Sequence, residues 1–369
     1  QALLNRPGEA NVSPLAVYRH PSMTDSVQRH RPNVVLIMME SMSCKFMKHF
    51  GQSETLTPFL DSLYTRSISF RNFYSAGIHT NHGLYATLYS FPAMMKRNLM
   101  KGSVIPRYSG LPTVLKENGY YNLFFMTHEG QYDNMNAFFR TNGYDEVFSQ
   151  ENYPADKVVN SFGVQDDFLY DYAIPVLNQR AATGQPFFAT LLSISNHPPY
   201  VIPPFFHPKT SEPETQIVEY ADWALRQFFE EARKQPWFDN TIFVLEGDHG
   251  KLVGAAECEL PESYNHIPLM IYSSRIQPEE KTTFGGQVDI QPTILGLLNI
   301  DYLQNNFGVD LLKEERPCMF YTADNMVVGR NDTLLYLYNY ETQQELTYDI
   351  GNGKLNAVPM DDSFLPLKE

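Results

Sequence analysis

Acidic and imidazole side chains recur in this sequence next to short apolar runs. Glu40 directly follows one such run, and Asp248 and His249 follow another, between Gly247 and Gly250. Carboxylates combined with imidazoles suit Mn²⁺ or Zn²⁺, whereas Ca²⁺ prefers a cage made only of oxygen atoms. Neighbours on a strand point to opposite faces, so Asp248 and His249 can reach one ion only from an irregular turn, which the flanking glycines allow. The pattern predicts a metal site.

Each of these residues also has a structural interpretation. A glutamate after a buried strand can serve only to interact with the start of a helix. His197, which follows an apolar run, and His266, which precedes one, can be ligands or ordinary structural histidines. His79 and His82 are interpreted as pocket wall or surface. The combination of these groups is therefore a stronger indication than any single member.

The apolar runs that would position these residues alternate with helical patterns over the first 310 residues. This alternation predicts an α/β fold with a doubly wound, mostly parallel central sheet flanked by helices. Ligands of such sheets gather at the carboxyl ends of the strands, where the candidate residues lie. The predicted strands are 33–39, 67–73, 121–126, 187–194, 241–245 and 269–272, and the predicted helices are 58–63, capped by Thr57, 112–119, closed by Gly119, and 217–234.

Three parts of the chain differ in character. Residues 1–32 are polar and rich in proline, which predicts an extended lead-in or linker. Residues 33–310 form the predicted catalytic domain. Residues 311–369 are expected to form a small C-terminal antiparallel β subdomain, with turns at 331–332 and 351–353.

The composition excludes several classes of protein. Hydrophobic residues make up 43% of the chain, enough to bury a large core. The 42 acidic residues outnumber the 28 basic ones, and a formal charge of −14 repels phosphate backbones, so we expect no nucleic-acid partner. Three cysteines are too few for a disulfide framework. No apolar run reaches the roughly 18 residues of a membrane span. Because the chain begins at Gln1 without a signal peptide, we expect a processed or excised piece, and anything that anchored it would lie outside this sequence.

Several motifs resemble those of the alkaline phosphatase/sulfatase superfamily, in the same order along residues 33–300. Within it, the sequence is most similar to the lipoteichoic acid synthase-like phosphoglycerol transferases. These carry a Glu after the first strand, a nucleophilic Thr in a Gly-x-x-Thr context, a Ser-x-His segment and an Asp-His pair. The segments that carry the resemblance are 39–41, 56–63, 70–75, 77–80, 111–120, 139–145, 162–167, 195–200, 246–250 and 288–295.

The resemblance implies one divalent metal ion, held by Glu40, Thr80, Asp248 and His249. Mn²⁺ is the expected ion, with Zn²⁺ or Mg²⁺ as alternatives. Thr80 is then the catalytic nucleophile, because a coordinated hydroxyl loses its proton more readily. Its attack on a phosphodiester would give a covalent phospho-threonine, resolved by a second alcohol or by water. His197 would act with it, protonating the leaving group or holding a phosphate oxygen.

The resemblance also implies a substrate and a location. We expect a phospholipid or another phosphodiester as donor, an alcohol as acceptor, and an extracytoplasmic site of action, periplasmic or at the cell surface, next to a membrane. His79, Asn81 and His128 are predicted to contact the substrate.

Two departures from the family pattern keep other functions open. The synthases hold glycerol phosphate with a Trp and an Arg, and residues 131–136 contain neither. His266 resembles the His-x-Pro histidine of phosphoethanolamine transferases, so His197 and His266 could hold a second metal or a phosphate. The Cys/Ser-x-Pro-x-Arg frame of true sulfatases is absent, which disfavours sulfate ester hydrolysis. The alternatives are a phosphoethanolamine transferase, a phosphodiesterase or sulfatase-like hydrolase, and an inactive homologue that binds a head group or glycan.

Overall fold

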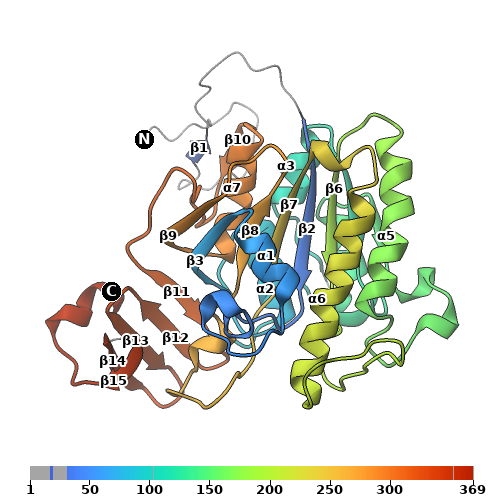
Figure 1. Ribbon diagram of the computed structural model, residues 1–369. Coiled ribbons are helices and arrows are strands. Elements are labelled where there is room, and N and C mark those ends of the chain that lie inside the picture. Colours follow the sequence, from blue (N-terminus) through green and yellow to red (C-terminus); the bar gives the residue numbers. More distant parts are fainter. Residues whose placement is uncertain (1–16, 20–30, 103, 352, 369) are drawn as a thin grey trace.

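The computed structural model of the protein describes residues 17–19, 31–102, 104–351 and 353–368. An eight-stranded sheet forms its centre, in the order β5-β4-β6-β2-β7-β8-β3-β9 (Figure 1). Neighbouring strands are parallel except at β8, which is antiparallel to both β7 and β3. This arrangement confirms the predicted α/β class with a mostly parallel sheet. The strands are β2 (Asn33–Met39), β3 (Ile68–Tyr74), β4 (Tyr121–Phe125), β5 (Glu146–Phe148), β6 (Phe187–Leu192), β7 (Thr241–Gly247), β8 (Leu269–Tyr272) and β9 (Glu279–Gly286).

Helices cover both faces of this sheet. The side chains of β2 alternate between the two faces: Val35 and Ile37 pack in one apolar core, and Val34 and Leu36 in the other. All four are fully buried, which explains why β2 reads as a continuous apolar run. The first core includes α1 (Pro58–Tyr64), α5 (Asp166–Ala181) and α6 (Pro213–Ala232), and the second includes α2 (Thr80–Tyr89), α3 (Leu111–Glu117), α4 (Met135–Thr141) and α7 (Ile290–Leu297).

The start of α1 differs from the prediction. Thr57 occupies the N-cap position, but its hydroxyl donates a hydrogen bond to Asp61 Oδ2 at 3.1 Å and does not cap the helix. The first free amides of the helix, those of Phe59 and Leu60, donate instead to the carboxylate of Asp222 in α6, each at 2.9 Å. A neighbouring helix therefore supplies the cap that the local sequence was expected to supply.

The predicted C-terminal antiparallel sheet is confirmed. Its five strands form a meander in which each strand is antiparallel to the next, and the predicted turn at 331–332 joins β12 to β13. The sheet lies against the end of β3, where Tyr74 stacks on Tyr321 with ring centroids 5.2 Å apart. The domain boundary at residue 310 stays a prediction. The strands are β11 (Met319–Thr322), β12 (Met326–Arg330), β13 (Leu334–Asn339), β14 (Gln344–Gly351) and β15 (Lys354–Ala357), and the helix α8 (Leu365–Lys368) follows them.

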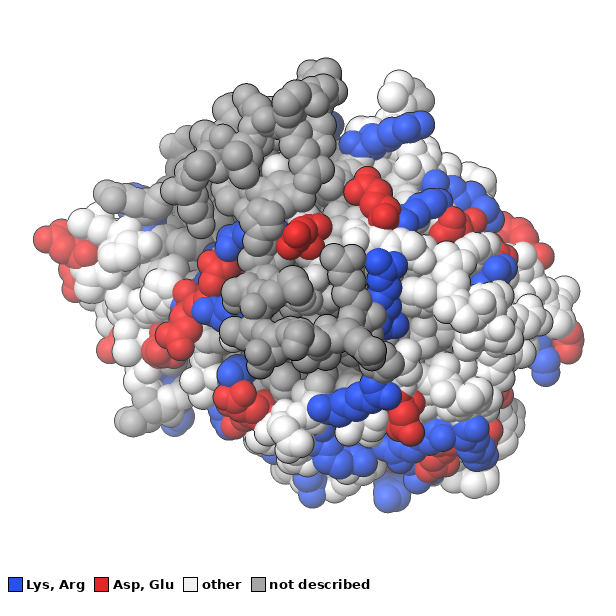
Figure 2. Space-filling model, turned by 90° about the horizontal axis from the view of Figure 1, so that it is seen from above, with Lys and Arg blue, Asp and Glu red and all other residues white. Residues whose placement is uncertain are grey.

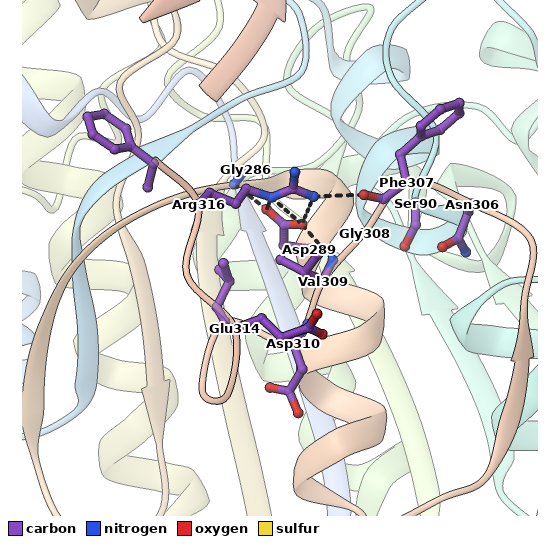
Figure 3. Close-up of polar contacts among 12 residues, drawn as sticks. Ser90, Gly286, Asp289, Asn306, Phe307, Gly308, Val309, Asp310, Glu314 and Arg316 are labelled. Atoms are coloured by element: carbon purple, nitrogen blue, oxygen red, sulfur yellow. Dashed lines mark hydrogen bonds and ion pairs between the residues drawn. The ribbon is translucent and has the colours of Figure 1, made fainter. Parts of the chain in front are cut away.

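A buried ion pair anchors the segment that leads to this sheet (Figure 3). The Asp289 side chain is inaccessible to solvent and lies 2.7 Å from the guanidinium Nη2 of Arg316. The amides of Gly286 and Val309 donate to the same carboxylate, at 3.0 and 2.8 Å. Arg316 also donates to the carbonyl of Phe307 at 2.7 Å. The aspartate of the 288–295 motif therefore has a structural role.

The predicted lead-in lies mostly outside the described residues, at 1–16 and 20–30. Within it, β1 (Val17–Arg19) pairs antiparallel with β10 (Tyr302–Gln304), and Arg19 forms an ion pair with Glu314 at 2.9 Å. This part of the lead-in therefore contacts both β10 and the segment that contains Glu314.

The described residues contain no helix with the length and apolar character needed to cross a bilayer. Figure 2 shows the molecule from above, with Lys and Arg interspersed among Asp and Glu. On the described part of that face, the excess negative charge therefore does not gather into a single acidic surface.

Candidate active site

Three strand ends and one helix start meet at one edge of the central sheet. Glu40 directly follows β2, Asp248 and His249 directly follow β7, and His197 lies in the loop after β6. Because β6, β2 and β7 are adjacent in the sheet, their carboxyl ends lie side by side (Figure 1). Thr80 is the first residue of α2. A pocket of about 450 Å³ opens here, with Glu40, Thr80, His197 and His249 in its wall.

The structure brings the four predicted metal ligands together. Ligand atoms of Glu40, Asp248 and His249 all lie within 4.8 Å of one another. His249 Nε2 is 3.8 Å from Glu40 Oε1 and 3.5 Å from Asp248 Oδ2. Thr80 Oγ1 lies 3.5 Å from Glu40 Oε2. That these groups bind a metal stays a prediction. The hydrogen bonds and charges of the candidate ligands show whether the site suits a cation.

Hydrogen bonds engage one ligand atom of Asp248 and one of His249, and they leave the other atom of each residue free. Asp248 Oδ1 accepts from the amides of Ser41 and His249, at 2.8 and 2.7 Å, whereas Oδ2 is buried without a hydrogen-bond partner. His249 Nδ1 lies 2.7 Å from the Gly250 carbonyl, so Nδ1 carries the proton and the Nε2 lone pair is free. An unpaired buried carboxylate oxygen is costly unless a cation or a donor meets it. The orphaned oxygen beside a free imidazole nitrogen therefore fits a divalent cation.

The Glu40 carboxyl fits the same interpretation. Burial, and then the charge of Asp248, raise the pKa of Glu40 well above its ordinary value, although Ser41 Oγ donates to it at 2.6 Å. Two buried carboxylates repel each other when both are ionised, and a divalent cation between them would favour the ionised form of both.

The backbone turn at Glu40 and Ser41 is held by Asn196. Its Nδ2 donates to the carbonyls of Glu40 and Ser41, at 3.2 and 3.1 Å. Ser41 itself has a φ of 51°, a costly conformation for a residue other than glycine.

Thr80 owes its position to the tight packing of α2. As the first residue of this ten-residue helix, it lies at the positive end of the helix dipole, where an anion is favoured. Gly83, one turn later, lets the helix approach the 247–250 turn closely, since a Cβ there would lie 2.3 Å from the Asp248 carbonyl oxygen.

Gln287 links two segments of this region through its buried side chain. Its buried amide donates to the carbonyls of Gly247 and Asp248, at 3.1 and 2.8 Å. Its oxygen accepts from the Ala76 amide at 2.9 Å, in the segment that leads to Thr80. One side chain therefore fixes the segment that leads to Thr80 relative to the 247–250 turn.

His197 presents one free ring nitrogen to the pocket. Its Nδ1 lies 2.6 Å from the Pro198 carbonyl, which leaves Nε2 for a substrate. The loop is held by Asp166, the first residue of α5, whose Oδ1 accepts from the amides of Ile194 and Ser195 at 2.9 and 3.0 Å. Burial raises the pKa of Asp166 to about 6.

The three predicted substrate-binding residues have different surroundings. His79 and Asn81 line the pocket on either side of Thr80, and His79 Nε2 lies 2.7 Å from Asp324 Oδ1, beside the C-terminal sheet. His128 is buried and packs against Tyr132, which does line the pocket, with ring centroids 4.6 Å apart. His128 is therefore placed to support the pocket wall rather than to touch a substrate.

The structure corrects the interpretation of two other histidines. His266 does not line the pocket: its Nε2 hydrogen-bonds the Arg71 carbonyl at 2.8 Å, and its ring stacks on Tyr74. A second metal or phosphate site shared by His197 and His266 is therefore not supported. His82, interpreted as pocket wall or surface, is buried, and this burial lowers its pKa to about 4.

Sequence reasoning missed Lys251, although it stands two positions after His249. Its Nζ donates to Asn196 Oδ1 at 2.5 Å and to the Tyr200 hydroxyl at 3.1 Å, in the pocket wall. Burial lowers its pKa to about 8, an effect that the charge of Glu40 partly offsets. Its position directly after the Gly-Asp-His-Gly turn was the one feature of the sequence that could have marked it as a site residue.

The fold is that of the alkaline phosphatase superfamily. A solved protein of this superfamily from Vibrio parahaemolyticus superposes with a TM-score of 0.84 and 28% identity, over 95% of this chain and 87% of that one. The lipoteichoic acid synthase LtaP from Listeria monocytogenes shares the fold, with a TM-score of 0.77 and 21% identity over 91% of this chain and 88% of that one. The family model described as Sulfatase matches residues 32–300, and the chain belongs to this family.

Relatives of known identity confirm the resemblance to the lipoteichoic acid synthase-like proteins. Lipoteichoic acid synthase 1 from Bacillus subtilis (strain 168) is 25% identical over 354 residues, which cover 88% of this chain and 54% of that protein. Lipoteichoic acid synthase from Staphylococcus saprophyticus is 24% identical over 320 residues, which cover 77% of this chain and 48% of that protein. The chain thus spans about half the length of the curated relatives it matches.

Proposed function

We propose that this protein is a metal-dependent enzyme that transfers a phosphoryl group from a phosphodiester, as a phosphoglycerol transferase does, with Thr80 as its nucleophile. One observation carries the proposal. The Thr80 hydroxyl stands at the start of α2, 3.5 Å from Glu40, in a cluster whose Asp248 Oδ2 is buried without a partner. A hydroxyl, two carboxylates and an imidazole at a helix N-terminus can activate a nucleophile and receive an anion.

Glu40, Thr80, Asp248 and His249 would hold the divalent cation. When bound, such a cation lowers the pKa of the threonine hydroxyl and offsets the charge that develops on the phosphoryl oxygens. The mixed oxygen and nitrogen donors favour Mn²⁺, with Zn²⁺ or Mg²⁺ as alternatives.

The chain's own groups account for the remaining steps. Thr80 Oγ attacks the phosphorus, and the bond from phosphorus to the first alcohol breaks. The Thr80 hydroxyl gives up its proton, and His197 Nε2, which is free in the pocket, would accept this proton and pass it to the departing alcohol. A second alcohol or water then attacks the phospho-threonine ester and frees Thr80.

The proposed donor is a phospholipid and the proposed acceptor an alcohol. The relatives named lipoteichoic acid synthases support this class, and the pocket volume of about 450 Å³ suits a small head group. Tyr132 and Asp133 line the side of the pocket that residues 131–136 provide, where the Trp and Arg of the synthases are missing. The head group can therefore differ from glycerol.

The proposed location is extracytoplasmic, at a membrane surface, where a lipid donor is available. The charge of −14 supports an absence of nucleic-acid partners.

Intact mass spectrometry tests this proposal. The Mn²⁺-loaded protein is incubated with vesicles of single phospholipids, and peptide mapping then locates any added head-group phosphate. We expect an adduct on Thr80, and loss of both the adduct and chromogenic phosphodiester turnover in Thr80→Ala. Wild-type turnover in Thr80→Ala would refute the mechanism. Release of free phosphate from monoesters, without an adduct from any lipid, would identify a phosphatase instead.

A further inference from the structure

The wall of the active-site pocket contains a lysine side chain. Among the described residues that line this wall, Lys251 is the only Lys or Arg, and Glu40 and Asp133 are acidic. A phosphodiester is an anion, so these carboxylates oppose its entry. A fixed positive charge in the wall would offset this repulsion at the place where the substrate binds.

The charges of Glu40 and Glu214 act on Lys251 from a distance, but neither carboxylate forms an ion pair with it. Among the residues that the structure describes, no Asp or Glu forms an ion pair with it, and its two hydrogen-bond acceptors, Asn196 Oδ1 and the Tyr200 hydroxyl, are neutral. An ammonium group has three N–H donors and two are used, so one remains for a ligand. A partly buried charge with neutral partners and a spare donor is suited to binding an anion.

The ammonium group is also held in one position. Nζ lies 4.7 Å from the ring centre of Tyr200 and 5.3 Å from that of Phe46, within the range of cation–π attraction. Its acceptor Asn196 is itself bound to the carbonyls of Glu40 and Ser41, at 3.2 and 3.1 Å. The position of the cation is therefore fixed relative to the metal-ligand turn, as selective binding requires.

We propose that Lys251 forms a phosphoryl-oxygen subsite: its free N–H donates to a non-bridging oxygen of the phosphodiester and selects anionic substrates. The inference rests on the proposed function, because it assigns the substrate to the same pocket. It adds the residue that would bind the anion apart from the metal. Sequence reasoning assigned no role to Lys251.

Calorimetric titration with glycerol 1-phosphate tests the subsite without requiring turnover. The Mn²⁺-loaded protein is compared with Lys251→Met, which keeps the length of the side chain but removes its charge, and with Lys251→Arg, which keeps the charge. We expect Lys251→Met to weaken binding about tenfold or more, and Lys251→Arg to remain within about threefold. Lys45→Met is the matched control, because Lys45 pairs with Glu257 at 2.9 Å and does not line the pocket; its affinity should not change.

Two further measurements separate binding from a structural role. The Mn²⁺ affinity and the urea midpoint of Lys251→Met should stay near the wild-type values, and its KM for bis(p-nitrophenyl) phosphate should rise more than its kcat falls. If Lys251→Met does not fold, Lys251→Gln replaces it. Wild-type affinity for glycerol 1-phosphate in the folded neutral variant would overturn the subsite, whatever the fate of Thr80. Weakened affinity would support it even if Thr80→Ala still turned over substrate and refuted the nucleophile.

Discussion

Replacing Gly83 by alanine should damage the active site without removing any functional group. Gly83 lies one turn into α2, and a Cβ at this position would be 2.3 Å from the Asp248 carbonyl oxygen and 3.0 Å from Gln287 Nε2. Real Cβ atoms essentially never lie closer than 3.0 Å to such an atom. The helix α2 and the 247–250 turn must therefore move apart by about 0.7 Å, from 2.3 Å to at least 3.0 Å. Both are backbone elements, and no side-chain rotation relieves the contact.

Opposing effects set the size of the loss. Alanine favours a helix over glycine by up to about 1 kcal/mol, whereas overpacking costs about 1–3 kcal/mol, so the net loss of stability should be modest. Activity should fall much further, because a misplacement of about 1 Å can cost about 100-fold in rate. Moving α2 displaces Thr80 relative to Asp248, and Mn²⁺ affinity should weaken together with phosphodiester turnover.

Gly296→Ala in α7 is the matched control for this prediction. Its Cβ would lie 2.1 Å from Asp310 Oδ2, a comparable clash, but with a side-chain atom that can rotate away and does not line the pocket. Mn²⁺ titration calorimetry and turnover of a chromogenic phosphodiester should show a large loss for Gly83→Ala and little change for Gly296→Ala. Wild-type Mn²⁺ affinity and turnover in Gly83→Ala would refute the argument that close packing of α2 positions the nucleophile.

Two buried aspartates give further predictions. Burial raises the pKa of Asp222 to about 7, so between about pH 4 and pH 7 the folded protein binds a proton that the unfolded chain releases, and stability falls as pH rises through that window. Urea unfolding at pH 5 and pH 8 should show a loss that is larger in the wild type than in Asp222→Asn by about 2 kcal/mol, because Asp166, whose pKa is raised to about 6, contributes to the loss in both proteins. The same pH dependence in the two proteins would contradict the role of Asp222. Asp166→Ala should lower the free energy of unfolding by about 1–3 kcal/mol and reduce kcat with unchanged Mn²⁺ affinity, because it leaves the Ile194 and Ser195 amides without their acceptor. Asp166→Asn should recover part of both losses, and an Asp166→Ala variant as stable as the wild type would show that this clamp is unimportant.

The central strands could be predicted because burial on both faces leaves a continuous apolar run, as in β2 and β7. Helix α5 was missed because Pro175 interrupts its pattern, yet the fold tolerates the proline. The cap of α1 was assigned to Thr57, but Asp222, distant in sequence, provides it. A local pattern therefore predicted the elements better than the contacts between them.

The same limit applies to the site. Glu40, Asp248 and His249 directly follow strands, so topology alone brings them to one edge, whereas Thr80 required the family resemblance. His266 precedes the antiparallel strand β8 and therefore lies at the same edge, but its ring packs on Tyr74 rather than in the pocket. Which way a side chain turns at a strand end depends on tertiary contacts that strand periodicity does not encode.

The supporting residues were the least predictable part of the site. Gln287 and Asp166 act through backbone amides and carbonyls of segments far away in sequence. No spacing rule connects a glutamine at the end of β9 to a loop after β7. Such contacts emerge only when the sheet order is known.

The most direct test of the account is anomalous diffraction from crystals grown with Mn²⁺, recorded at the manganese absorption edge. The account predicts a peak coordinated by Glu40, Asp248, His249 Nε2 and the Thr80 hydroxyl together. Full occupancy of Mn²⁺ elsewhere, or at this edge of the sheet with Thr80 outside coordination distance, would contradict the claim that the cation activates this threonine.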